Sequence, residues 1–215
     1  LRRGGNNMEM DWKTNMAELG GAFMVALLVL GEMDDSKVMA GLLLAVTMAA
    51  MAGAHVLPMF TWISAMTGDL QDTDAWMNNG MRLVFQLVGA CVAALLMAEG
   101  GDVSANADIS TWSFELWGPD AAEGAAANNM DGAAMMLAAG ALMGAIASRC
   151  DGWMTAFAVV ALAGSLGAGV DGASMMAGEL LGEGGDIVAG LSHWIVDGVV
   201  IGLGAMLGGM LDEQL

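Results

Sequence analysis

Apolar runs separated by polar segments form the main pattern of this chain. Six runs approach the roughly 20 helical residues needed to cross the hydrocarbon core of a bilayer. Two further apolar pieces, at about 57–67 and 175–182, are too short to cross. The pattern predicts an all-α membrane protein with six transmembrane helices. The six runs lie at about 16–31, 38–54, 82–98, 132–148, 153–170 and 191–211.

The composition supports this interpretation. Apolar residues make up 57% of the 215 residues and charged residues only 14%, against roughly 25% charged in ordinary soluble proteins. A chain of this length forms one modest domain, so a larger core does not account for the excess. The 32 glycines suit helices that pack closely in lipid. We therefore expect a single transmembrane domain over residues 1–215 that lies in the lipid bilayer.

The charge pattern bears on partners and on orientation. The net charge of −18 comes from acidic segments between the apolar runs, which indicates solvated loops and argues against nucleic-acid binding. With the N-terminus in the cytoplasm, only Lys37 among the basic residues falls outside the cell, and this agrees with the positive-inside rule. We expect both termini in the cytoplasm and a plasma-membrane location. The basic residues on the inner side are then Arg2, Arg3, Lys13, Arg82 and Arg149.

Few residues suggest covalent or metal chemistry. Cys91 and Cys150 lie in or beside apolar runs and are expected to be free thiols. The 22 methionines are expected to fill the core, with a copper pathway through thioethers as the alternative. No set of acid, base and nucleophile is recognisable, so we expect neither an enzyme nor a cofactor or metal site. The first residue is not Met, and Met8 or Met10 is a candidate start.

The chain also carries an internal repeat. A shift of 119 residues places Met16, Gly21, Ala22 and Met24 on identical residues, and at the same shift Gly89 faces Gly208. The repeats span about 14–98 and 132–211, with an acidic external linker over 99–131. Each repeat holds three spans, so the second copy enters the membrane inverted, as in many channels and transporters. The two short apolar pieces then enter from opposite faces as half-helices.

Three segments resemble the aquaporin (major intrinsic protein) family. Gly53–Thr61 reads GAHVLPMFT and is similar to the first re-entrant loop of that family, SGxHxNPAVT. Gly172–Glu179 reads GASMMAGE and is similar to the second, GxSxNPAR, while Ala17–Phe23 resembles the first helix, AExxGTF. The resemblance implies six helices, two half-helices, a homotetramer and passive flow of water or small neutral solutes.

The resemblance also implies roles for individual residues. Leu57 and Met176 replace the paired asparagines, so the central constriction is expected to be apolar. Glu18 and Gln86 are expected to brace a re-entrant loop, with Glu18 accepting its backbone N–H groups. His55 either braces the loop or lines the pore. The expected lining residues are His55, Leu57, Pro58, Met59, Met176, Ala177 and Gly178.

Three further positions fall on the selectivity filter of that family. These are Lys37, Gly164 and Glu179, the last in place of an arginine. A pore-facing Glu179 favours cations, whereas Lys37 could neutralise it, or Glu179 could point into an acidic loop. Asp197 is read as lying near a membrane boundary, with a pore-facing position as the alternative.

The expected function is a passive channel for water or small neutral solutes such as glycerol. Two alternatives remain open at this point. One is a cation-conducting pore selected by Glu179. The other is a non-conducting structural membrane protein that keeps the same fold.

Overall fold

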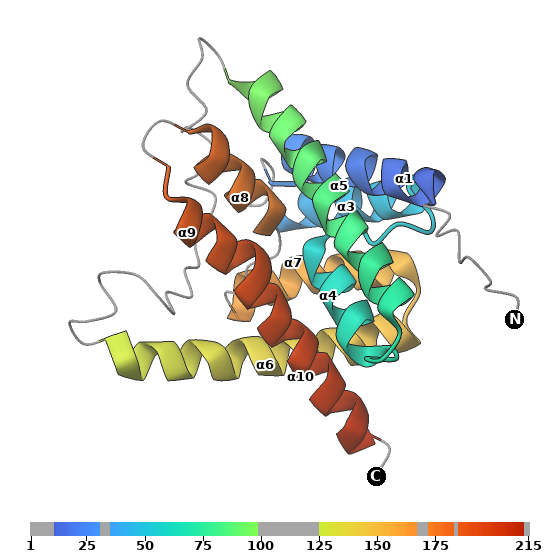
Figure 1. Cartoon of the computed structure of the whole chain (residues 1–215), viewed down its shortest axis with the longest axis vertical. Helices are drawn as coiled ribbons and strands as arrows, with labels where there is room; N and C mark the ends of the chain where they lie inside the picture. Colours follow the sequence, from blue (N-terminus) through green and yellow to red (C-terminus); the bar gives the residue numbers. More distant parts are fainter. Residues whose placement is uncertain (1–10, 31–34, 99–124, 167–171, 183–184, 213–215) are drawn as a thin grey trace, which may run out of the picture.

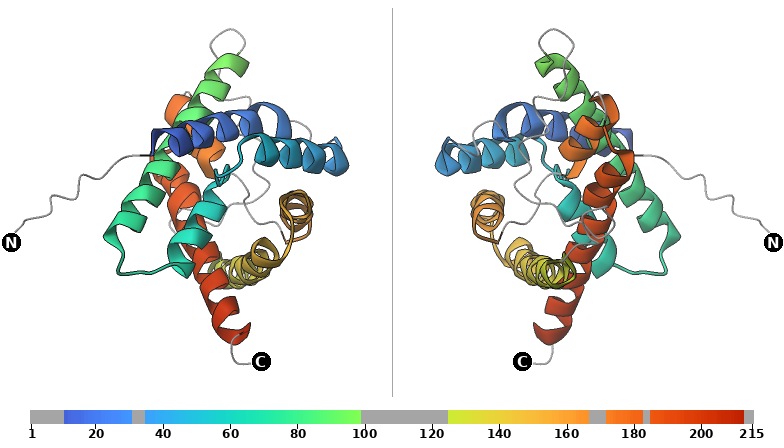
Figure 2. Two further views of the ribbon diagram at one scale, coloured as in Figure 1. Left: turned by 90° about the vertical axis from the view of Figure 1, so that its right-hand side faces the viewer. Right: turned by 90° about the vertical axis from the view of Figure 1, so that its left-hand side faces the viewer.

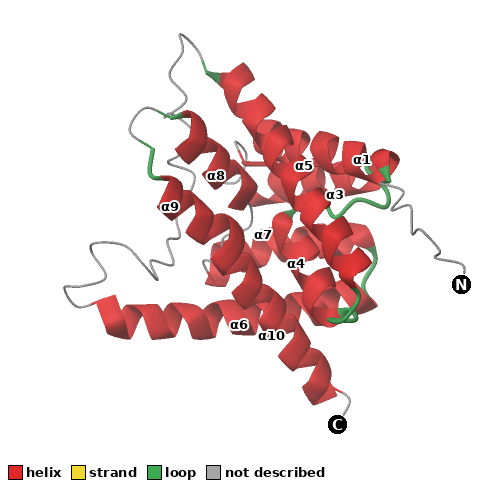
Figure 3. Ribbon diagram, in the orientation of Figure 1, coloured by secondary structure: helices red, strands yellow, loops and turns green. Residues whose placement is uncertain are grey.

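A computed structural model describes residues 11–30, 35–98, 125–166, 172–182 and 185–212. All regular elements in these ranges are helical, and no strand occurs within them (Figure 3). The predicted all-α class is therefore confirmed for the described part of the chain.

The first half forms one set of helices. The π-helical segment η1 continues α1 without a break, and the short helix α4 separates α3 from α5 (Figure 1). The bounds are α1 Trp12–Met24, η1 Val25–Val29, α3 Lys37–Ala50, α4 Pro58–Thr67 and α5 Thr73–Met97.

The second half repeats this order. The short helix α8 follows α7, and the last three segments follow one another directly. The bounds are α6 Ala125–Arg149, α7 Gly152–Leu166, α8 Gly172–Leu181, α9 Ile187–Leu191, η5 Ser192–Val196 and α10 Asp197–Asp212. Helix α6 begins inside the stretch 99–131 that was expected to be a linker, and residues 99–124 of that stretch lie outside the described ranges.

Side-chain caps explain why two helices begin earlier than the apolar runs. The Asp11 carboxylate accepts the Thr14 N–H and hydroxyl at 3.1 and 2.6 Å, and these bonds hold the pKa of Asp11 below its usual value. Asp72 accepts the N–H groups of Asp74 and Ala75, so α5 begins nine residues before the expected run. A cap satisfies N–H groups that have no partner inside the helix, so a helix can begin in polar sequence.

The helix contacts of the two halves correspond. Helix α1 packs on α5 as α6 packs on α10, and α4 packs on α10 as α8 packs on α5. Figure 2 shows α10 crossing α6. Helices α3 and α7 contact each other, as do the ten-residue helices α4 and α8. Helices α1, α3, α4 and α5 of the first half correspond to α6, α7, α8 and α9–α10 of the second. Exchanging the two sets turns the α1–α5 contact into α6–α10 and the α4–α10 contact into α8–α5, and it leaves the α3–α7 and α4–α8 contacts unchanged.

The correspondence corrects the shift expected from the sequence. In two matching close contacts, Leu19 corresponds to Leu137, 118 residues further on, and Gly89 corresponds to Gly204, 115 residues further on, whereas the expected shift was 119. A Cβ atom on Gly89 would lie 2.2 Å from the Leu19 carbonyl oxygen, and one on Gly204 would lie 2.2 Å from that of Leu137. The counterpart of Gly89 is thus Gly204 and not Gly208. No single shift relates the halves, because their connecting segments differ in length.

Much of the apolar surface faces outward. Among the described residues, two helices are long and apolar enough to span a membrane by length and composition, Thr73–Met97 and Trp194–Asp212. Only 28% and 33% of their apolar windows are buried. Helix α5 exposes Val84, Val88 and Val92 at four-residue spacing. An exposed apolar stripe of this kind suits lipid better than water. Shorter apolar helices cover Lys37–Ala50, Ala133–Arg149 and Gly152–Leu162.

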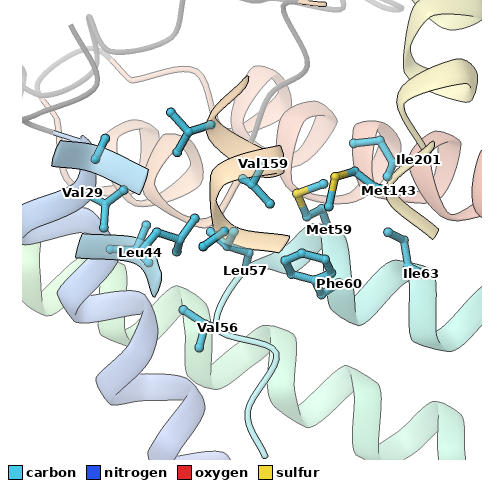
Figure 4. Close-up of a cluster of buried hydrophobic side chains, with 14 of the residues drawn as sticks. Val29, Leu44, Val56, Leu57, Met59, Phe60, Ile63, Met143, Val159 and Ile201 are labelled. Carbon is cyan, nitrogen blue, oxygen red and sulfur yellow. The ribbon is translucent and has the colours of Figure 1, made fainter. Parts of the chain in front are cut away.

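The central apolar cluster lies where η1, α3, α4, α6, α7 and α10 meet. Figure 4 shows Leu44, Leu57, Met59 and Val159 gathered at the start of α4, with Met143 beside them. Each of these side chains is at most 4% exposed. Buried methionines are part of this cluster, which agrees with their expected role as core residues.

Candidate functional site

The loop between α3 and α4 contains the most unusual backbone of the described residues. Gly53 and Val56 have φ angles of +93° and +68°. Helix α4 then begins at Pro58, a residue suited to the first helical position because its missing N–H would have no partner there. Leu57 precedes it in extended conformation and makes no side-chain cap bond. The first expected half-helix therefore starts where its sequence indicated.

Glu18 is the centre of a polar cluster that holds this loop. Its side chain is fully buried, and its carboxylate accepts four hydrogen bonds. The backbone N–H groups of His55 and Val56 donate at 2.6 and 2.8 Å. The Arg82 guanidinium donates at 2.9 Å and the Gln86 amide at 2.7 Å. Glu18 thus makes the bonds to loop N–H groups that its sequence context predicted, and Gln86 belongs to the same cluster.

Thr61 connects this cluster to the His55 ring. The Gln86 amide also donates to the Thr61 hydroxyl at 3.0 Å, and His55 Nδ1 lies 3.1 Å from the same oxygen. Thr61 is fully buried in the first turn of α4. These contacts favour the bracing role of His55 over the pore-lining role.

Arg82 is the residue of this polar cluster whose contacts were not predicted from the sequence. It was used there only to set the orientation, yet it forms the ion pair with buried Glu18 and also donates to the Gly53 carbonyl at 3.3 Å. Its side chain is 21% exposed, so it links the buried carboxylate to the surface. A signal was present, because Arg82 lies four residues before Gln86 and therefore on the same face of the helix.

The second half corrects the expected place of Met176. Helix α8 runs from Gly172 to Leu181, so Met176 is an interior residue of the helix and does not precede it as Leu57 precedes α4. Ala177 and Gly178 lie beside it in the same helix, and all three are buried. A Cβ atom on Gly190 would lie 2.8 Å from the Met176 sulfur, so Met176 packs against α9. Residues 167–171, which precede α8, lie outside the described ranges.

No contact among the described residues brings the three expected filter positions together. The Glu179 carboxylate accepts the backbone N–H of Asp186, as expected of an acid that faces its own loop. Lys37 is exposed at the start of α3, and no ion pair joins it to Glu179 in the part of the chain that the structure describes. Gly164 lies within α7. Asp197 is buried where η5 meets α10, and its position relative to a membrane boundary stays a prediction.

No protein-family model, curated protein or solved structure matches this chain. Its function is therefore inferred from the residues and contacts described above.

Proposed function

We propose that this protein is a passive transmembrane channel of aquaporin-like architecture that carries water or small neutral solutes such as glycerol. The observation that supports it most strongly is the contact between α4 and α8 within two corresponding sets of helices. A ten-residue helix is about 15 Å long, half of the roughly 30 Å hydrocarbon core. Two such helices in contact suit a pair of half-helices that meet near the centre of the bilayer.

The Glu18 cluster suits a loop at membrane depth. Backbone N–H groups without partners are costly in a bilayer, and irregular backbone is tolerated there only when it is buried or lines a cavity. Glu18 and its partners supply the loop with internal hydrogen bonds. The apolar side chains of Leu57, Leu44 and Val159 offer an ion no replacement for its water shell, so the site favours neutral solutes.

The proposal extends to topology and assembly. The six crossings are α1–η1, α3, α5, α6, α7 and α9–α10, with both termini in the cytoplasm of a cell whose plasma membrane holds the protein. A homotetramer is the assembly that the family resemblance implies. The proposal involves no catalysis.

One observation favours a second candidate, a non-conducting structural membrane protein. Leu44, Leu57 and Val159 are only 1%, 2% and 1% exposed, so apolar side chains fill the centre of the helix bundle. We do not favour a cation pore, because the Glu179 carboxylate accepts the Asp186 N–H.

Osmotic flux tests the proposal. Proteoliposomes containing the purified protein are expected to shrink in stopped-flow light scattering faster than empty liposomes, and to re-swell when glycerol enters. Leu57→Trp is expected to reduce the flux to background because the larger ring fills the centre. Val88→Trp is the matched control, since Val88 is 44% exposed on the outer face of α5 and should leave flux unchanged. Flux no faster than that of empty liposomes would favour the structural candidate.

A further inference from the structure

We infer that Arg82 is a positioning residue. Through Glu18 it holds the loop around Val56 in a strained turn and so keeps Leu57 in the apolar centre. The contacts of Arg82 and Glu18 with this loop are called the latch below. The latch itself follows from hydrogen bonds, burial and backbone angles of described residues. Its consequence for flow rests on the proposed channel function.

The turn at Val56 is of a rare kind. The Leu57 N–H donates to the His55 carbonyl at 2.8 Å across Val56, and Val56 has a φ of +68°. An i to i+2 hydrogen bond around a residue of positive φ is typical of the classic γ-turn, which is rare and strained. Valine is among the residues least suited to positive φ, because its branched side chain crowds the backbone. Other contacts must supply the free energy that holds this turn.

Two contacts hold Val56 directly. Its N–H donates to the Glu18 carboxylate at 2.8 Å, beside the bond from the His55 N–H. Its side chain is fully buried against Gly21, where an added Cβ atom would lie 2.9 Å from Val56 Cγ2. Glycine at position 21 therefore makes room for a side chain in this unusual position.

Arg82 allows the buried Glu18 carboxylate to accept these N–H groups as an ion. A buried carboxylate is stable as an ion only when a positive charge and hydrogen bonds compensate for lost water. The guanidinium lies 2.9 Å from Glu18 Oε1 and also reaches the Gly53 carbonyl, so it contacts the loop at its other residue of positive φ. Without Arg82, the loop loses both its compensating charge and one of its direct contacts.

Leu57 is the residue that this latch places. It follows Val56 immediately and lies in the apolar cluster with Leu44 and Val159 (Figure 4). If Val56 relaxes to negative φ, the direction of the chain changes at Leu57 and its side chain leaves the cluster. In the proposed channel, the latched loop is the narrow state and the released loop is the wider one.

The direct test is the reactivity of a thiol at position 57. Leu57→Cys is prepared in protein whose free cysteines, Cys91 and Cys150, are replaced by alanine. In detergent it is expected to react slowly with a small methanethiosulfonate reagent. Adding Arg82→Gln should raise the rate about tenfold or more, as expected for loss of a hydrogen bond between charged groups. Arg82→Lys keeps the charge and should stay within about threefold of the parent.

Ile201→Cys is the matched control, because Ile201 is 1% exposed on α10 and lies on the side of the cluster away from Leu57 (Figure 4). Its rate should not change when Arg82→Gln is added. A similar increase at both positions would mean that the fold has loosened generally, and this would overturn the latch. Equal rates at position 57 with and without Arg82→Gln would overturn it as well.

A second variant tests the backbone strain at Val56, and it gives a result even if Arg82→Gln alone folds poorly. Glycine adopts positive φ readily, so Val56→Gly should remove the strain that the latch opposes. In that background, Arg82→Gln or the milder Arg82→Lys should change the rate at position 57 by less than in the Val56 protein. An equal effect in both backgrounds would contradict the inference.

Flux and thiol reactivity separate the two hypotheses. A rate at position 57 that depends on Arg82, together with no flux in any variant, would support the latch and exclude the channel. Flux with a rate that does not depend on Arg82 would support the channel and exclude the latch.

Discussion

Glu18→Leu is expected to lower the free energy of unfolding by about 3–5 kcal/mol, the range typical of breaking a buried ion pair by removing one partner. The change leaves Arg82, Gln86 and two loop N–H groups without their acceptor. It also removes the hydrogen bond from the Val56 N–H that helps to hold this residue at positive φ. Thermal unfolding of the purified protein in detergent, followed by tryptophan fluorescence, measures the loss.

Asp35→Asn is the control for this prediction. Asp35 is exposed, and an exposed substitution away from such contacts usually changes stability by less than about 0.5 kcal/mol. Glu18→Gln should give an intermediate loss, because its amide keeps one acceptor oxygen but brings N–H groups close to Arg82 and Gln86. A Glu18→Leu protein as stable as the Asp35→Asn protein would show that the polar cluster contributes little to the fold.

Gly89→Ala is expected to lower the free energy of unfolding by about 3 kcal/mol or more, at the upper end of the range for overpacking a core. The new Cβ atom would lie 2.2 Å from the carbonyl oxygen of Leu19 and 3.1 Å from the Phe23 nitrogen. Both atoms belong to the α1 backbone and cannot rotate away as a side chain would. Helices α1 and α5 must therefore move apart, which weakens the packing that presents Glu18 to Arg82 and Gln86.

Gly80→Ala provides a matched control on the same helix. A Cβ atom there meets nothing within 4 Å, so only helix propensity changes, and alanine should stabilise α5 by about 1 kcal/mol. Gly204→Ala should resemble Gly89→Ala, because its Cβ atom would lie 2.2 Å from the Leu137 carbonyl oxygen. Thermal unfolding of the three variants checks the order, and equal stability of Gly89→Ala and Gly80→Ala would refute the close approach.

The positions of the helices could be predicted from the sequence to a large extent. The apolar runs and the two short pieces fall on the observed helices, and α4 covers 58–67 where 57–67 was expected. Runs of apolar residues predict helices because a helix is formed by residues that are neighbours along the chain. The first residues of the helices were harder to predict, because α1 and α5 are capped by Asp11 and Asp72, which lie outside the apolar runs.

The candidate site could be predicted only in its first half. The motif around His55 and the buried Glu18 pointed to the same loop, because a carboxylate in an apolar run needs donors. In the second half, a shift of 119 put Met176 opposite Leu57, whereas Met176 lies inside α8 and no single shift relates the halves. A chain rich in glycine, alanine and methionine offers several similar alignments, and only the contacts between helices choose among them.

The sequence by itself determined the all-helical class, the apolar runs and the residue types that a buried loop requires. The tertiary structure decided which of these residues meet. Arg82 and Glu18 are 64 positions apart, and Gly89 approaches Leu19 only because α1 and α5 pack together. The positive φ of Val56 follows from bonds to Glu18 and from the space at Gly21. Such contacts depend on how helices pack across long separations in sequence, and local periodicity carries no record of that packing.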